Sequence, residues 1–327
     1  MAQRHRIAEP PMAVNKVRLP DGRKAINGFR VLEELGSGSF AKVKLCEEES
    51  SAERFAMKVF RKGLLRKQRE FIKDESTGGM KVRTSLDKVQ GEIAVMRRVA
   101  HENCIRLHAV FDEDDAHGKL YLILEYAAHG CIMDWDSERC VYQTRAFPDG
   151  LVPEAVAAAY VRDTLRGLGY LHGLPIAHRD IKPQNLLVHA DGRVKIGDFG
   201  VAIAMEGDFK IHGTEGSYCF FSPEMCRTPY SGHDGRLADV WALGVTLWAF
   251  LYGSVPFMQQ DLLPLLDSIA EAKYTLPVSP RVGEEGQALL RRLLTPEAGA
   301  RPLPAELLED PWCRRPPEAA AQIRPPR

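Results

Sequence analysis

The chain has 327 residues, 45% of them apolar, so it can bury a large core and is long enough for two lobes or two domains. Its 44 basic and 44 acidic residues cancel, and this balance gives no sign of a nucleic-acid partner or of an anionic membrane. The seven cysteines form no C-x-x-C pair, which favours reduced thiols and a cytoplasmic location, with the nucleus as a second compartment.

Two segments bear on targeting. Residues 1–27 are basic, contain prolines and lack an apolar run, so we expect a flexible leader and no secretory signal. The longest apolar run, 240–253, is too short to span a bilayer and predicts a buried core helix. We therefore expect no membrane partner.

Short β-type runs alternate from residue 28 to residue 126, with one helix near residues 88–99. Gly36 and Gly38 lie between two of these runs. Glycine lets a backbone approach phosphates closely, although about half of such pairs are ordinary turns. Ala41 stands where a third glycine would follow, so we expect a slightly stiffer loop that still binds a nucleotide.

Lys58 lies in a strand-like run, where a lysine is more often a solvated edge charge. Glu92 is the best candidate for a partner, because apolar residues lie beside it on one face of the expected helix. Glu70 and Glu75 compete for Lys58, but both lie in a polar stretch without such apolar support.

Three side chains with oxygen donors follow one another in the second half of the chain. Asp180 is followed by Asn185 and, thirteen residues later, by Asp198 in an Asp-Phe-Gly turn. Phosphoryl transfer needs a positioned nucleophile and bound Mg²⁺, which takes few protein oxygens and keeps other positions for phosphate and water. The order therefore predicts that Asp180 orients a hydroxyl and accepts its proton, while Asn185 and Asp198 bind Mg²⁺.

These motifs together resemble the eukaryotic protein kinases, because the glycine-rich stretch, the strand lysine, the catalytic segment and the metal-binding turn occur in the family's order. The resemblance implies ATP as phosphate donor and an α+β, two-lobed fold. The implied segments are a leader (1–27), a kinase domain (28–313) with a β-rich lobe (28–126) and a helical lobe (127–313), and a short proline-rich tail (314–327).

The resemblance also implies which residues bind ATP. Lys58 contacts the α and β phosphates, while the carbonyl of Glu125 and the amide of Ala127 bind adenine at the hinge. Asp134 is a candidate for the ribose, although an acid there could equally cap the next helix. Each apolar position taken singly is more often a plain core residue. The other nucleotide-binding positions are Leu35, Gly36, Gly38, Val43, Ala56, Glu92, Leu124, Leu187 and Asp198.

Lys182, two residues after Asp180, is typical of serine/threonine kinases, and its charge would neutralise the γ-phosphoryl group during transfer. Ser217 would contact both side chains and shape the site for a serine or threonine acceptor. Thr214 is the position expected to be phosphorylated, with Arg179 binding the added phosphate through charge-assisted hydrogen bonds.

Two long-range supports are implied as well. Glu224, in a Ser-Pro-Glu sequence, should form a buried ion pair with Arg301 that fastens the base of the activation loop. The apolar run that contains Asp239 resembles the helix that supports the catalytic segment from beneath.

In detail the chain resembles the calcium/calmodulin-dependent kinase kinases and the related Snf1-activating kinases over roughly residues 24–313. Like them, it carries a long insert between Lys58 and Glu92. The resemblance implies that the protein substrate is another serine/threonine kinase, of the AMP-activated or Snf1 type, modified on its activation-loop threonine. The insert is basic, and both a docking surface and a plain solvated face remain open.

Other classes also remain open. A pseudokinase would serve as a binding scaffold, but it would have lost phosphate-binding or metal-binding residues that this chain keeps. A small-molecule phosphotransferase would not need the residues of a protein-substrate loop, and a kinase with non-kinase substrates is a further alternative. The proline-broken tail gives calmodulin binding no support. The extra length between residues 134 and 150 could be only a surface loop.

Overall fold

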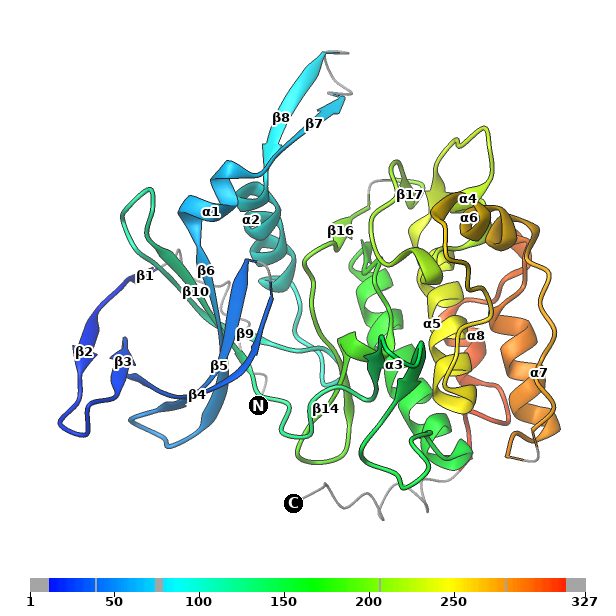
Figure 1. The fold of residues 1–327 in the computed structure, drawn as a ribbon, viewed down its shortest axis with the longest axis horizontal. Helices are drawn as coiled ribbons and strands as arrows, with labels where there is room; N and C mark the ends of the chain where they lie inside the picture. Colours follow the sequence, from blue (N-terminus) through cyan, green and yellow to red (C-terminus); the bar gives the residue numbers. More distant parts are fainter. Residues whose placement is uncertain (1–11, 39, 74–78, 206, 280, 316–327) are drawn as a thin grey trace. The chain divides into compact units, whose positions relative to one another are not determined.

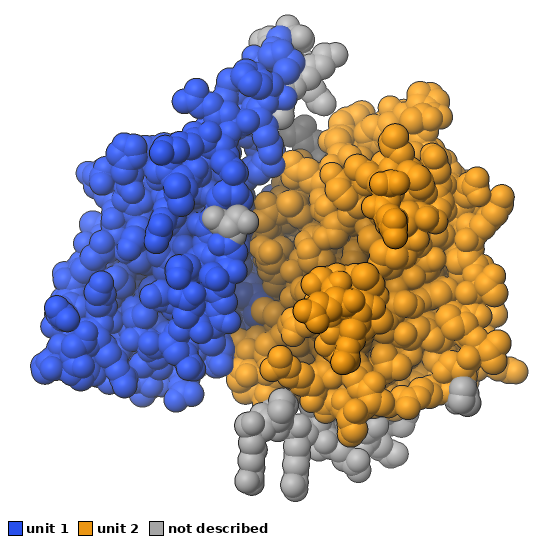
Figure 2. All heavy atoms as spheres, in the orientation of Figure 1, with its two compact units in different colours: residues 1–100, 105–126 blue, residues 101–104, 127–327 orange. Residues whose placement is uncertain are grey.

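The computed structural model describes residues 12–38, 40–73, 79–205, 207–279 and 281–315 (Figure 1). The chain forms two compact units, one of residues 1–100 and 105–126 and the other of residues 101–104 and 127–327 (Figure 2). A β-sheet builds most of the first unit, and helices dominate the second. The predicted α+β class is therefore confirmed.

An eight-stranded sheet forms the body of the first unit, in the order β1-β9-β10-β6-β5-β4-β3-β2. Neighbouring strands are antiparallel, except that β1 and β9 are parallel. The strands are β1 (Met12–Ala13), β2 (Lys16–Arg18), β3 (Lys24–Ile26), β4 (Phe29–Ser37), β5 (Ala41–Glu48), β6 (Arg54–Arg61), β9 (Leu107–Asp112) and β10 (Lys119–Glu125).

The described part of the N-terminal segment belongs to this sheet, so the prediction of a flexible leader over residues 1–27 is wrong from residue 12 onward. Asn27 takes a left-handed φ of 48°. Its side chain accepts the Asn15 N–H at 2.6 Å and donates to the Ala13 carbonyl at 2.9 Å. Ile26 is 5% exposed and packs in the core with Phe29. Residues 1–11 lie outside the described ranges.

The basic insert folds into a short helix, α1 (Lys62–Lys67), and a hairpin of β7 (Arg69–Lys73) and β8 (Met80–Thr84) that extends from the first unit (Figure 1). Lys62 is 5% exposed. Its ammonium lies 2.5 Å from the carboxylate of Asp112 on β9. Lys62 is therefore buried and paired, so the solvated-face alternative does not hold for this residue.

Helix α2 (Ser85–Met96) covers the sheet face that carries the even-numbered side chains of β6 and β10. Thr84 and Asp87 form a capping box in which each side chain accepts the other's backbone N–H. The helix therefore begins three residues earlier than predicted. Val89 and Ile93 pack against Leu122 of the sheet, which fixes the side of α2 that faces the sheet.

Helices make up most of the second unit, with short hairpins between them. The helices are α3 (Glu154–Gly173), α4 (Pro223–Cys226), α5 (Gly235–Tyr252), α6 (Leu262–Glu271), α7 (Glu284–Leu293) and α8 (Pro304–Leu308), with 3₁₀ turns at Pro183–Asn185, Tyr218–Phe220 and Ala298–Ala300. The paired strands are β11 (Asp134–Asp136) with β12 (Val141–Gln143), β13 (Ile176–Ala177) with β16 (Ile203–Ala204), β14 (Leu186–Val188) with β15 (Val194–Ile196), and β17 (Lys210–Ile211) with β18 (His233–Asp234).

Helix α5 is the buried helix that the longest apolar run predicts. Its N-cap is Asp234, whose side chain accepts the Arg236 N–H at 2.9 Å, and its C-cap is Gly253, where a φ of 69° favours glycine. Val240 and Trp241 are fully buried. Across the described ranges, no helix combines the length and the apolar content needed to cross a membrane.

Candidate active site

Lys58 on β6 forms an ion pair with Glu92 on α2 inside the first unit. Lys58 Nζ lies 2.7 Å from Glu92 Oε1, and the two side chains are only 17% and 4% exposed. The predicted pairing is confirmed. Glu70 instead lies 2.8 Å from the ammonium of Lys88 on α2, and Glu75 lies outside the described residues.

Four predicted nucleotide-binding side chains share one face of the sheet. Val43 on β5 lies opposite Lys58, and Ala56 on β6 lies opposite Leu124 on β10. Residues directly opposite each other, or two apart on one strand, point to the same face. The strand register therefore places a lysine beside three small or aliphatic side chains, as a site for a base and its phosphates requires.

The glycine-rich stretch forms the end of β4 and the turn into β5. A Cβ added at Gly36 would meet no atom within 4 Å, and one at Gly38 would meet only the Ala41 carbonyl at 3.9 Å. Packing within the protein therefore does not require glycine at residues 36 and 38, whereas a ligand that approaches the backbone closely would require it. Leu35 is 42% exposed beside them. Ala41 lies opposite Phe60 in the sheet and packs against the core cluster that contains Phe60.

The hinge positions use backbone groups other than those predicted for adenine. The Glu125 N–H donates to the Arg106 carbonyl at 2.9 Å, and the Ala127 carbonyl accepts the Gly130 N–H at 3.1 Å. Adenine binding is predicted for the Glu125 carbonyl and the Ala127 N–H. The two sets of contacts are compatible, and the adenine contact stays a prediction.

In the second unit, Asp180 lies at the centre of a polar cluster. Its Oδ1 accepts the Ser217 N–H at 3.1 Å and the Ser217 hydroxyl at 2.8 Å. Its Oδ2 lies 2.7 Å from Lys182 Nζ and accepts the Asn185 amide at 2.8 Å. Lys182 Nζ also donates to Ser217 Oγ at 2.8 Å. The prediction that Ser217 contacts both Asp180 and Lys182 is confirmed.

The hairpin of β14 and β15 brings Asn185 and Asp198 to one end. Leu186 pairs with Ile196, and the Gly197 N–H donates to the Asn185 carbonyl at 2.8 Å. Because the amide nitrogen of Asn185 donates to Asp180, its side-chain oxygen is the atom suited to a cation. Within the described ranges no three His, Cys, Asp or Glu side chains form a metal-binding group. Two oxygen donors nevertheless suit Mg²⁺ that is shared with phosphate and water.

Asp239 of α5 supports the catalytic segment from the protein interior. Its Oδ1 accepts the Arg179 N–H at 2.8 Å, and its Oδ2 accepts the His178 N–H at 2.9 Å and lies 3.0 Å from His172 Nε2. Burial alone would raise the pKa of Asp239. The hydrogen bond to His172 and the charges of His172 and His178 outweigh burial, so the pKa of Asp239 lies below its usual value. The predicted support by this helix is confirmed.

Arg179, which precedes Asp180, already binds an acidic side chain. Its Nη2 lies 3.2 Å from Glu215 Oε2, and its Nε donates to the Val201 carbonyl at 2.5 Å. Thr214, the predicted phosphorylation position, is exposed next to Glu215. Nothing in the sequence marked Glu215, because a single loop acid carries no periodic pattern.

Arg301 and Glu224 form the expected ion pair. The two carboxylate oxygens of Glu224 accept from Arg301 Nη1 at 2.9 Å and from Nη2 at 3.1 Å, and the arginine side chain is fully buried. The guanidinium also donates to the carbonyls of Leu237 and Thr295. Burial alone would raise the pKa of Glu224. The hydrogen bond and the positive charge of Arg301 outweigh burial, so the pKa of Glu224 lies below its usual value. The prediction is confirmed.

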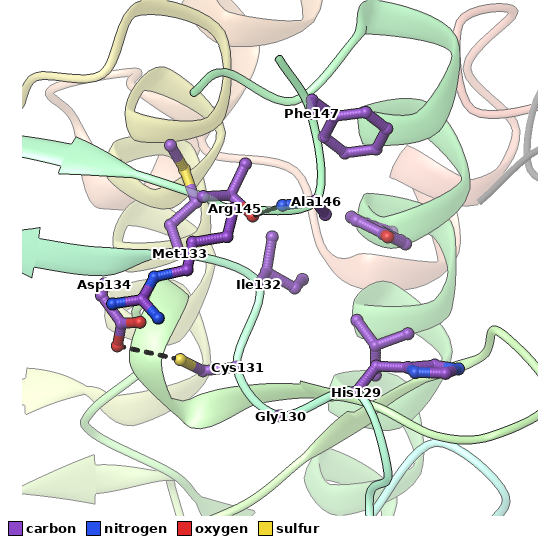
Figure 3. A pocket seen from close by; sticks show the side chains of 12 residues that line it. His129, Gly130, Cys131, Ile132, Met133, Asp134, Arg145, Ala146 and Phe147 are labelled. Carbon is purple, nitrogen blue, oxygen red and sulfur yellow. Dashed lines mark hydrogen bonds between the residues drawn. The ribbon is translucent and has the colours of Figure 1, made fainter. Parts of the chain in front are cut away.

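Asp134 begins β11 and accepts the Cys131 thiol at 3.1 Å (Figure 3). Both residues line a pocket of about 240 Å³ in the second unit, together with Arg145 and Phe147. Burial, followed by the Asp134 hydrogen bond, raises the pKa of Cys131 to about 12. The alternative in which Asp134 caps the next helix is wrong, because the β11–β12 hairpin precedes α3.

The structure collects the predicted site residues in two groups. The first unit holds Leu35, Gly36, Gly38, Val43, Ala56, Lys58, Glu92, Leu124 and Glu125. The second unit holds Ala127, Asp134, Arg179, Asp180, Lys182, Asn185, Leu187, Asp198, Thr214 and Ser217.

Comparison with known proteins agrees with this geometry. A protein kinase domain model matches residues 29–313. The chain is 36% identical to serine/threonine-protein kinase ssp1 of Schizosaccharomyces pombe, over 89% of this chain and 43% of the relative. It is 34% identical to calcium/calmodulin-dependent protein kinase kinase of Caenorhabditis elegans, over 89% and 53%, and 32% identical to serine/threonine-protein kinase TOS3 of Saccharomyces cerevisiae, over 78% and 45%. The chain thus spans about half the length of these curated relatives.

Proposed function

Because the chain belongs to the protein kinase family and carries the domain of an ATP-dependent serine/threonine kinase, we propose that its substrate is another kinase, modified on an activation-loop threonine. A serine or threonine acceptor is supported by the cluster in which Ser217 contacts both Asp180 and Lys182. A serine or threonine hydroxyl that enters beside Ser217 meets the same carboxylate and the same ammonium.

Each residue of the cluster has a separate role in this proposal. Asp180 orients the acceptor hydroxyl and takes its proton late in the transfer. Lys182 offsets the negative charge that spreads over the moving phosphoryl group. Asn185 holds Asp180 through its amide nitrogen, and together with Asp198 it would bind Mg²⁺, which shields the phosphate charges. The chain thus supplies positioning and charge, as this reaction requires.

A kinase as substrate is supported by the relatives and by the insert. The Caenorhabditis elegans relative is named as a kinase of a calcium/calmodulin-dependent protein kinase. On the β7–β8 hairpin, Phe71 is 70% and Met80 is 68% exposed, and Arg69, an exposed cation two residues before Phe71, lies on the same face of the hairpin. Exposed apolar side chains beside a cation fit a protein surface that carries apolar and acidic groups.

A panel of inactive kinases tests the proposed substrate. Each target would carry a substitution of its own catalytic aspartate, so that any new phosphate comes from this enzyme, and the sites would be mapped by mass spectrometry. We expect one dominant activation-loop threonine, and no product when that threonine is replaced by alanine. Faster modification of unstructured, non-kinase proteins than of any target kinase would contradict the proposed substrate class.

Lys58→Met should lower kcat/KM for ATP by about 10²- to 10³-fold, because removing one preorganised donor to a reacting charge has effects of that size. Lys62→Met is the matched control, since it also removes a buried, paired lysine of the first unit. Steady-state kinetics with varied ATP would measure both variants. Equal losses in the two variants would assign the effect to stability alone.

A further inference from the structure

The side chain of Arg179 connects two parts of the loop that follows the metal-binding turn. Its side chain is 7% exposed. Nε donates to the carbonyl of Val201, near the start of the loop, and Nη2 lies 3.2 Å from Glu215 Oε2, near its end. The backbone of Arg179 takes a φ of 67° and donates to Asp239. The guanidinium is therefore fixed by the fold on one side and by a carboxylate on the other.

The two residues after Glu215 contact the catalytic segment directly. Gly216 takes a φ of 122°, and a Cβ there would lie 2.3 Å from the Arg179 carbonyl oxygen, so the backbones touch. Ser217 then donates its N–H and its hydroxyl to Asp180 Oδ1. Three consecutive loop residues thus contact two consecutive catalytic-segment residues. A displacement of Glu215 would move the donors that orient Asp180.

We infer that Glu215 is a positioning residue for phosphoryl transfer: its carboxylate gives Arg179 the negative partner that a phosphate on Thr214 would otherwise provide. The side chain of Glu215 is 29% exposed, and the ion pair is partly shielded from water. Thr214 is exposed and precedes it. This inference rests on the proposed role of Asp180 and deepens it. With Glu215 in place, phosphoryl transfer would not depend on phosphorylation of the loop.

Charge explains why a phosphate on Thr214 and the carboxylate of Glu215 would not bind Arg179 together. A phosphate on Thr214 would bring a charge of about −1.5 to −2 beside the existing carboxylate. Both groups would then compete for the same guanidinium, and like charges repel. A built-in carboxylate makes this added phosphate unnecessary.

The test compares turnover of protein freed of phosphate, with an unmodified Thr214 verified by mass spectrometry, on the preferred kinase of the panel above. Wild type and Thr214→Ala should have equal kcat. Glu215→Gln should lose about 10- to 100-fold in kcat, as expected for one hydrogen bond to a charged group, with KM for ATP unchanged and partial rescue in Glu215→Asp. Asp208→Asn, an exposed acid of the same loop, is the matched control and should keep the wild-type kcat.

A double-mutant cycle separates positioning from general stability. Once Arg179 is replaced by glutamine, adding Glu215→Gln should cause no further loss of kcat, because the pair acts as a unit. Full kcat in Glu215→Gln would overturn the inference. Wild-type turnover that appears only after Thr214 is phosphorylated would also overturn it, while leaving the proposed kinase activity intact. The comparison of wild type with and without phosphate on Thr214 needs no variant at residue 215. It therefore tests the inference even if Glu215→Gln does not fold.

Discussion

Replacing Asp180 with asparagine should lower kcat by about 10²- to 10⁴-fold, the usual contribution of a positioned general base. Asparagine has the same shape but cannot take the proton of the acceptor hydroxyl. All four contacts of the carboxylate come from donors, on Ser217, Lys182 and Asn185. An amide nitrogen would therefore face a donor in either orientation, so both chemistry and local order suffer.

Asp267→Asn provides the control for this prediction, because Asp267 is an exposed aspartate on α6, in the same unit as Asp180. Its kcat should match that of the wild type. Steady-state phosphate transfer and thermal unfolding would be measured for both variants. An Asp180→Asn protein that folds and turns over at the wild-type rate would remove Asp180 from the mechanism.

Arg301→Met should lower the free energy of unfolding by about 3–5 kcal/mol, because breaking a buried ion pair leaves an uncompensated charge. The variant loses both bonds to Glu224 and leaves the carbonyls of Leu237 and Thr295 without this donor. Methionine fills much of the space but supplies no hydrogen bond. Chemical denaturation of the purified protein would measure the change.

Arg227→Met is the matched control for Arg301→Met, since it removes an exposed arginine whose guanidinium lies 3.5 Å from Glu297, with exposures of 42% and 76%. A surface pair of this kind contributes about 0–1 kcal/mol. We expect the loss in free energy of unfolding to be several-fold larger for Arg301→Met than for Arg227→Met. If both cost the same, the buried pair does not secure the end of the loop.

The sequence was sufficient for the parts of the site that depend on local spacing. Lys58 and Glu92 could be paired because the apolar positions of one helix placed Glu92 on the face toward the sheet. Asp180, Lys182 and Asn185 lie within six residues of one another, so a single turn brings them together. The run around Asp239 was recognised as a buried helix from its continuous apolar content.

Long-range partners explain the errors. The segment before residue 28 looked flexible because its composition is basic, but the side chain of Asn27 and the burial of Ile26 attach it to the sheet. Lys62 looked like one more solvated cation. Its partner Asp112 lies fifty residues away in the sequence, and no local pattern predicts such a contact.

The role of an acidic residue in a loop was also not predicted from the sequence. The sequence drew attention to Thr214 because a hydroxyl can be phosphorylated, whereas its neighbour Glu215 looked like ordinary surface charge. Only the position of Arg179 in the folded chain shows that the carboxylate lies against the guanidinium. Ion pairs between loops depend on backbone paths that propensity and periodicity do not determine.

Whether Asp180 serves a serine/threonine kinase can be tested by phosphoamino-acid analysis after incubation of wild type and Asp180→Asn with γ-labelled ATP, Mg²⁺ and an inactive kinase target. We expect label on threonine or serine with the wild type and loss of nearly all of it with Asp180→Asn. Label confined to tyrosine, or equal label with both proteins, would contradict a serine/threonine kinase built around Asp180.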